Sequence, residues 1–145
     1  MVSIIIPSHN PIYLQKTVDE LLNNAKGEVE VIAVLDGYWT KLNDDKRVRI
    51  VHLGKNRGMR GAINAGVLVS SGKYIMRTDE HCMFGDGYDQ LLSLQCEENW
   101  IMTARRYFLD PVQWKVMDEK PVEHEKLVIQ GGVKFAGQRW PSRDE

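Results

Sequence analysis

The chain has 145 residues, a formal net charge of -1 at pH 7 and 43% hydrophobic residues, which is typical of one ordinary globular domain. Its 19 Lys and Arg residues balance 20 Asp and Glu residues without a long basic stretch, so nucleic acid is not an expected partner. No apolar run approaches the roughly 20 residues of a transmembrane segment, and two cysteines make no disulfide framework, so we expect a soluble, cytoplasmic protein.

The first part of the chain predicts a strand, a helix and a second strand. Residues 2–6 form a β-branched run that ends at a proline, which is typical of a buried strand. Asn10 is expected to cap a helix over residues 11–25, with the next proline at its first position and apolar residues at helical spacing. Residues 29–35 are again apolar and β-branched, and this second strand is expected to end on Asp36.

Two further strands and a helix between them follow. Residues 47–53 and 73–77 have strand-like composition, and residues 57–70 have helical periodicity. Met59, Ala62, Ile63 and Gly66 share one helix face, expected to pack on the core, whereas Arg57, Arg60 and Asn64 share a polar face. The element order predicts an α/β fold with a mostly parallel central sheet.

The last third of the chain is less regular. Residues 86–97 predict another helix with Tyr88 and Leu91 among its apolar members, and residues 100–109 and 127–135 look like strands. Gly131-Gly132 is expected to turn a hairpin within the second of these segments, and residues 139–145 are expected to be a loose tail.

Polar residues stand where three of the predicted strands end. Asp79-Glu80-His81 follows the fourth strand, Asp36 ends the second, and Pro7-Ser8-His9-Asn10 ends the first. Because parallel strands deliver their carboxyl ends to one edge of a sheet, these residues are expected to meet in one crevice. Asp79 and His81 project to the same side of an extended segment and can share one cation. The alternative is a solvated loop in which His81 only caps or packs, but the position at a strand end favours a site.

The phosphate-binding loop and the dinucleotide glycine pattern are both absent from the sequence. A bound diphosphate would therefore need another source of positive charge. A divalent ion held by Asp79 and His81 would supply it.

Several segments resemble the GT-A glycosyltransferases, and in particular the large family 2 that uses nucleotide sugars. Residues 2–10 look like the first strand and donor loop of that family, and Asp36-Gly37 is similar to its Asp-Gly after the second strand, with Leu35 where members commonly have another Asp. A longer match in register covers residues 56–79. Its motifs are Asn56-x-Gly58, Ala62-x-Asn64-x-Gly66 and Ser71-Gly72-x-Tyr74-Ile75, followed by Asp79.

The residues Asp79-Glu80-His81-Cys82 resemble the Asp-x-His-Cys motif of the polypeptide N-acetylgalactosaminyltransferases, which share the GT-A fold. The resemblance implies that Asp79 and His81 hold Mn²⁺, or Mg²⁺, against the diphosphate of a sugar nucleotide, with Glu80 in a variable middle position. Gly131-Gly132-x-x-Phe135 is more faintly similar to a segment of the donor pocket in those enzymes.

The resemblance implies a GT-A, Rossmann-like sandwich and a metal-dependent glycosyltransferase that moves a sugar from a nucleotide-diphosphate sugar, expected to be a UDP-sugar, to an acceptor hydroxyl. Asp79 is the expected catalytic residue. The expected donor-binding residues are Pro7, Ser8, His9, Asn10, Asp36, Asn56, Arg60, Asn64 and Asp79. Several of them have simpler interpretations, because Asn10 can be only a helix cap, Asp36 can stabilise a turn, and Arg60 and Asn64 can form a solvated helix face.

Relatives in the resembled families continue into an acceptor half that carries the base and selects the acceptor, whereas this sequence stops at Glu145. We expect one nucleotide-sugar-binding domain over residues 1–145, with the acceptor half reduced or missing. The alternatives are a donor-binding or regulatory module, one part of a transferase that a second chain completes, and a nucleotidyltransferase on a related scaffold. Inversion and retention both stay open, and His124, between two glutamates, is interpreted as part of a charged loop and not as a third metal ligand.

Overall fold

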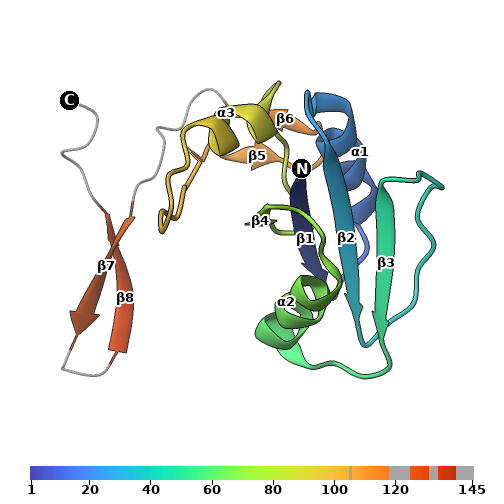
Figure 1. Ribbon diagram of the computed structural model, residues 1–145. Coiled ribbons are helices and arrows are strands. Elements are labelled where there is room, and N and C mark those ends of the chain that lie inside the picture. The colour runs from blue at the N-terminus through green and yellow to red at the C-terminus, as the bar shows by residue number, and fades with distance from the viewer. Residues whose placement is uncertain (105, 118–124, 131–133, 140–145) are drawn as a thin grey trace. The chain divides into compact units, whose positions relative to one another are not determined.

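The structure is a computed structural model that describes residues 1–104, 106–117, 125–130 and 134–139. The chain divides into two compact units, Met1–Ile101 and Met102–Glu145. The first unit holds an α/β sheet with three helices, and the second holds two short antiparallel pairs of strands (Figure 1).

The sheet of the first unit has four parallel strands in the order β3-β2-β1-β4. They are β1 (Val2–Ser8), β2 (Val29–Asp36), β3 (Val48–Leu53) and β4 (Tyr74–Arg77). The three consecutive isoleucines of β1 are fully buried, as expected for a central strand that is covered on both faces. The predicted mostly parallel sheet is confirmed.

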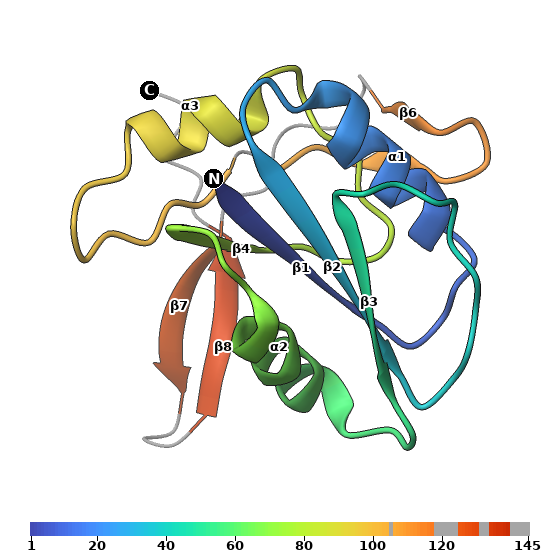
Figure 2. The ribbon, with the colours of Figure 1, turned by 45° about the vertical axis from the view of Figure 1, so that its right-hand side comes forward.

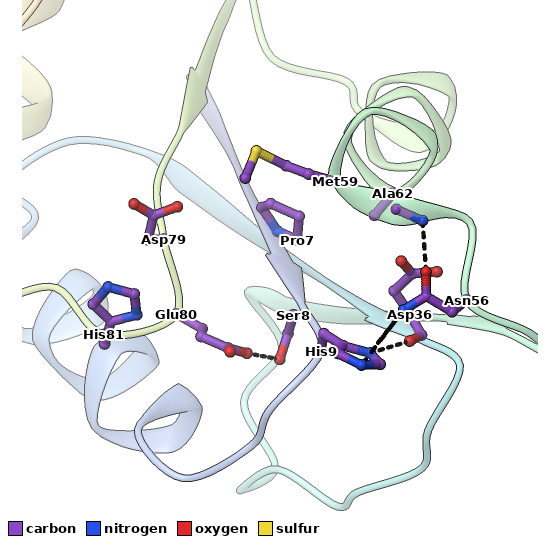
Figure 3. Close-up of a pocket in the computed structure, with 11 residues that line it drawn as sticks. Pro7, Ser8, His9, Asp36, Asn56, Met59, Ala62, Asp79, Glu80 and His81 are labelled. Carbon is purple, nitrogen blue, oxygen red and sulfur yellow. Dashed lines mark hydrogen bonds between the residues drawn. The ribbon is translucent and has the colours of Figure 1, made fainter. Parts of the chain in front are cut away.

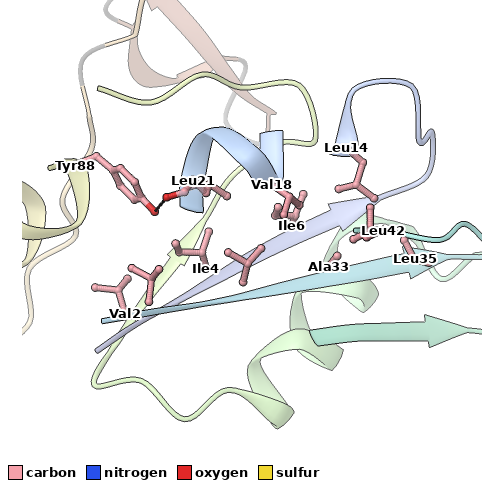
Figure 4. Packing of buried hydrophobic residues seen from close by; sticks show 12 residues of the cluster. Val2, Ile4, Ile6, Leu14, Val18, Leu21, Ala33, Leu35, Leu42 and Tyr88 are labelled. Atoms are coloured by element: carbon pink, nitrogen blue, oxygen red, sulfur yellow. Dashed lines mark hydrogen bonds between the residues drawn. The ribbon is translucent and has the colours of Figure 1, made fainter. Parts of the chain in front are cut away.

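Helix α1 (Leu14–Asn24) covers one face of the sheet and α2 (Gly58–Val69) covers the other, as Figure 2 shows. Successive strand side chains point to opposite faces, so Ile4 and Ile6 pack under α1 while Ile5 packs under α2. Figure 4 shows the larger cluster, to which α1 contributes Leu14, Val18 and Leu21.

Small residues allow α2 to lie close to the sheet. Ala62 is fully buried, and a Cβ on Gly66 would lie only 2.6 Å from the Cγ2 of Ile5. The Ala62-x-Asn64-x-Gly66 part of the sequence pattern therefore serves helix packing through its first and last members.

The predicted start of the first helix is wrong by three residues. Helix α1 begins at Leu14, its N-cap residue is Tyr13, and no side chain caps it. Asn10 instead accepts a hydrogen bond from the Ile12 backbone N–H through Oδ1 at 3.3 Å, which makes a local turn. The backbone N–H of Asn10 is bound to Glu80, so this residue is held in the loop after β1 and not at the helix end.

The helix predicted over residues 86–97 is shorter, because α3 spans Tyr88–Leu94. Its first turn docks on the end of α1, where the Asp89 carboxylate accepts hydrogen bonds from the backbone N–H groups of Lys26 and Gly27 at 3.0 and 2.7 Å. The Tyr88 hydroxyl donates to the backbone oxygen of Leu21. Leu91, one of the predicted apolar members of this helix, is 60% exposed.

The strand predicted over residues 100–109 is also wrong. Of this segment, only the last residue belongs to a strand among the described residues, in β5 (Leu109–Asp110), which pairs with β6 (Lys115–Val116). The carboxylate of Asp110 accepts hydrogen bonds from the next turn, so the chain folds back at once. A β-rich run without a pairing partner does not form a strand.

The hairpin predicted near the C-terminus is present. Strand β7 (Glu125–Gln130) pairs antiparallel with β8 (Lys134–Arg139), and Gln130 lies opposite Lys134. The glycine pair at 131–132, the tail after 139 and His124 lie outside the described residues. In the part of the chain that is described, no helix has the length and apolar character needed to cross a membrane, and the cytoplasmic location stays a prediction.

Candidate functional site

A pocket of about 340 Å³ lies where the chain leaves three of the parallel strands (Figure 3). The sheet order reverses between β1 and β4, which is where open α/β sheets bind ligands. The three strand ends that the sequence predicts to meet do line one pocket. Its lining residues are Pro7, Ser8, His9, Asp36, Asn56, Gly58, Met59, Ala62, Asp79, Glu80 and His81.

One side of the pocket is built where β2 ends. The Asp36 side chain is buried, at 3% exposure, and its Oδ1 accepts a hydrogen bond from the Arg57 backbone N–H at 2.7 Å. Gly37 has a φ of +83°, and a Cβ there would lie 2.6 Å from the Asn56 backbone nitrogen. The missing side chain at Gly37 thus lets the loop before α2 approach β2, which brings Asn56 to the pocket.

His9 connects this side to the end of β1. Its Nδ1 lies 2.9 Å from the Asp36 backbone oxygen and 3.1 Å from the Asn56 side-chain nitrogen. Residues from three separate loops therefore form one polar edge, which Figure 3 shows opposite Asp79 and His81.

The other side of the pocket follows β4. The backbone N–H of Thr78 still donates to Ile5 of β1 at 3.1 Å, so Asp79 stands where the strand pairing stops. The Asp79 side chain is 44% exposed, and its Oδ1 accepts a hydrogen bond from Arg77 Nη2 at 2.5 Å. The same nitrogen of Arg77 lies 3.2 Å from the Met59 sulfur, and His81 is exposed at the rim.

Glu80, the middle residue of the triplet, lies in a hydrogen-bonded chain. Ser8 Oγ donates to a Glu80 carboxylate oxygen and is also bonded to the Tyr38 hydroxyl. The Asn10 backbone N–H donates to Glu80 Oε1 at 3.1 Å. Burial raises the pKa of Tyr38 and the charge of Glu80 adds to this, which outweighs the opposing effect of the hydrogen bond with Ser8. Tyr38 therefore stays protonated and can donate to Ser8.

The contacts of Glu80 are not predicted by the sequence. Successive side chains of an extended segment point to opposite sides, so the sequence does indicate that Glu80 points away from its two neighbours, Asp79 and His81. Its partner could not be read from the sequence, because Ser8 lies 72 positions away.

The donor set at the pocket fits a hard divalent cation. Three lining residues are carboxylates and two are histidines, and the lining is acidic even though Arg77 pairs with Asp79 from beside the pocket, so the site attracts positive charge. Asp79 and His81 would supply one oxygen and one nitrogen ligand; the carboxylate suits Mn²⁺ or Mg²⁺, whereas the imidazole favours Mn²⁺. Among the described residues no group of three or more His, Cys, Asp and Glu could hold an ion. The rest of the coordination sphere would come from water and from a bound anion.

Three of the expected donor-binding residues are not among the residues that line the pocket. Arg60 and Asn64 are exposed on α2, and Asn10 contacts Glu80 through its backbone. Their donor-binding role stays a prediction. The structure places Met59 and Ala62 in the pocket instead, because the helix face assigned to the core continues beyond the sheet at its first turn.

The parallel sheet, its flanking helices and the acidic triplet after β4 define an α/β protein of the GT-A type. Residues 3–136 match glycosyl transferase family 2, and the chain belongs to this family. The match covers most of the chain and includes every residue that lines the pocket.

Individual relatives are also named as glycosyltransferases. An uncharacterized glycosyltransferase of Rickettsia bellii is 33% identical over 115 residues, which cover 73% of this chain and 16% of that protein. An uncharacterized glycosyltransferase of Haemophilus influenzae is 27% identical over 74% of this chain and 47% of its own length. Glycosyltransferase GlyG of Streptococcus pneumoniae is 27% identical over 68% of this chain and 36% of its own length. The chain spans less than half the length of each of these relatives.

Proposed function

We propose that this chain binds a UDP-sugar in the pocket and, with Mn²⁺ or Mg²⁺, transfers the sugar to an acceptor hydroxyl. Membership of glycosyl transferase family 2 supports sugar transfer in general. The observation that carries the finer proposal is the single pocket that joins buried Asp36 to Asp79 and His81. It offers hydrogen-bond acceptors at one side and cation ligands at the other.

Asp36 is proposed to receive the nucleoside. Its Oδ1 is occupied by the Arg57 N–H, so the second oxygen is the one offered to a donor such as the uracil N–H or a ribose hydroxyl. Because the carboxylate is buried and fixed, binding a donor there costs little side-chain entropy. His9 and Asn56 flank this position.

Asp79 and His81 are proposed to hold the metal ion beside the diphosphate. When bound, the ion would neutralise the negative charge that grows on the departing diphosphate. The bond from Arg77 to Oδ1 holds the Asp79 carboxylate and would leave Oδ2 for the ion. The Arg77 guanidinium also adds a positive charge at the side of the pocket where the phosphates would lie.

The test is release of UDP from a panel of UDP-sugars in the presence of Mn²⁺. We expect release by the wild type and a loss of about a hundredfold or more in Asp79→Ala and His81→Ala. Asp86→Ala is the matched control, because Asp86 forms an exposed ion pair with Lys26 and does not line the pocket.

Two outcomes would change the proposal. A wild-type protein that neither binds nor cleaves any UDP-sugar with Mn²⁺ would overturn it. Metal-dependent binding without turnover in the presence of acceptors would replace it with a donor-binding module, or with one part of a transferase that a second chain completes.

A further inference from the structure

We propose that Glu80 is a positioning residue that holds the two sides of the pocket in register, so that one ligand can engage both sides at once. This inference rests on the proposed function, because it assigns the two sides to the nucleoside and to the metal-bound diphosphate. The juxtaposition that carries it is the hydrogen-bonded chain Tyr38–Ser8–Glu80–Asn10 at the ends of β1, β2 and β4.

Each residue of this hydrogen-bonded chain is a close sequence neighbour of residues that line the pocket. Glu80 stands between Asp79 and His81, and Ser8 and Asn10 stand on either side of His9. Tyr38 follows Asp36 by two residues. A shift of Glu80 relative to its partners would therefore move the metal side of the pocket relative to the nucleoside side.

The hydrogen bonds of this chain of residues all lead toward Glu80. Tyr38 donates to Ser8, Ser8 donates to Glu80, and the Asn10 backbone N–H donates to both Glu80 oxygens, at 3.1 and 3.3 Å. An ionised carboxylate accepts and does not donate, so Glu80 suits the end of this chain. Ser8 is buried, and without Glu80 its hydroxyl would lose its carboxylate acceptor.

Glu80 is thereby distinguished from the two proposed metal ligands. Both of its oxygens accept hydrogen bonds from the protein, whereas Asp79 accepts the Arg77 bond through Oδ1 and His81 is exposed. Removal of Glu80 should leave each side of the pocket able to bind its own part of the ligand. What should be lost is the advantage of binding both parts in one molecule.

The experiment compares three ligands, uridine, Mg²⁺ and UDP with Mg²⁺, by titration of the labelled protein followed through its amide NMR signals. The variants are Glu80→Ala, Glu80→Gln and Tyr38→Phe. Glu28→Gln is the matched control, because Glu28 is an exposed glutamate before β2, at the opposite edge of the sheet. For Glu80→Ala we expect the affinity for UDP with Mg²⁺ to fall about tenfold, the affinity for uridine to stay unchanged, and the affinity for Mg²⁺ alone to fall by much less than tenfold.

Glu80→Gln keeps the side-chain size and one oxygen acceptor, and Tyr38→Phe removes one hydroxyl without a change of charge. Both should show smaller losses for UDP with Mg²⁺ only, and they keep the test available if the alanine variant does not fold. Glu28→Gln should match the wild type in all three titrations.

Three results would overturn the inference while the proposed function stands. They are unchanged binding of UDP with Mg²⁺ in the Glu80 variants, an equal loss for all three ligands, and a loss of Mg²⁺ binding alone, which would make Glu80 a metal ligand. A wild type that does not bind UDP with Mg²⁺ would instead overturn the proposed function, and the inference with it.

Discussion

The two ends of β1 use the same chemical device for different purposes. At the amino end, Ser3 Oγ donates to Glu30 at 2.5 Å and accepts from the Gly72 N–H at 2.7 Å. At the carboxyl end, Ser8 Oγ donates to Glu80. In both places a buried serine of the central strand donates to a glutamate of another segment, Glu30 of β2 at one end and Glu80 after β4 at the other.

The difference lies in what surrounds each pair. Glu30 also accepts hydrogen bonds from the backbone and the hydroxyl of Ser71, so it closes the turn between α2 and β4. The residues of this network do not line the pocket, whereas Ser8 and Glu80 do. The Ser71-Gly72 part of the family 2 sequence motifs therefore maintains the sheet, while the residues at the carboxyl ends of the strands build the site.

The largest expected effect comes from Asp79→Asn, which keeps the size of the side chain and removes its charge. The rate of UDP release should fall about 10²–10³-fold, because the proposed metal ligand that supports the departing diphosphate is lost. The melting temperature should change little, since the ion pair with Arg77 is partly exposed and worth at most about 1 kcal/mol. Asp86→Asn is the control, and release that stays near the wild-type rate in Asp79→Asn would contradict the assignment.

Gly37→Ala tests how the nucleoside side is built. The φ of +83° and the approach of the Asn56 backbone should make this change cost about 2–3 kcal/mol of unfolding free energy, measured by urea denaturation. Affinity for UDP should fall as well, because Asn56 must move. Gly54→Ala is the control, in the loop between β3 and α2 that also holds Asn56, since a Cβ there meets nothing within 4 Å. Equal stability of the two variants would show that the close approach is not required.

Gly72→Ala tests the hydrogen-bonded network at the amino end of β1. A Cβ there would lie 2.6 Å from Ser3 Oγ and 2.7 Å from its backbone nitrogen, so we expect a loss of about 1–2 kcal/mol in unfolding free energy. Affinity for UDP with metal should stay at the wild-type value, as it should in the control Gly85→Ala, where the space is open. A selective loss of affinity in Gly72→Ala would contradict the conclusion that the amino end of β1 maintains the sheet and does not build the site.

The smallest effect concerns pH. Burial by itself raises the pKa of Glu30, but hydrogen bonds from Ser3 and Ser71, aided by Arg49, outweigh it and lower the pKa below its ordinary value of 4.5. A lowered pKa in the folded state stabilises the protein above pH 4.5, and this contribution disappears as the pH falls through the lowered value.

The unfolding free energies of the wild type and Glu30→Gln, measured at several pH values, check this. The advantage of the wild type should shrink as the pH falls from about 7 to about 3. A difference that is constant over this range, or one that grows toward acid, would contradict the lowered pKa.

The sheet and the meeting of its strand ends could be predicted because both depend on local patterns. Continuous β-branched runs such as residues 29–35 identify buried parallel strands, and parallel strands place their final residues at one edge. Asp36 and Asp79 were therefore placed together in the pocket correctly, although they lie 43 positions apart.

Other features depend on partners that are distant in the sequence. The start of α1 was mispredicted because the Asn10 backbone is held by Glu80. Of the described residues of the segment 100–109, only Leu109 is in a strand, because a β-rich run needs a neighbour. The chain from Tyr38 to Glu80 joins three loops, so no local pattern could reveal it.

The most direct measurement is electron–nuclear double resonance of Mn²⁺ bound to the protein together with UDP. The account predicts that one Mn²⁺ shows coupling to an imidazole nitrogen and to the phosphorus nuclei of UDP, and that the nitrogen coupling disappears in His81→Ala. Phosphorus coupling with no nitrogen coupling in the wild type, or a nitrogen coupling that persists in His81→Ala, would contradict the metal site.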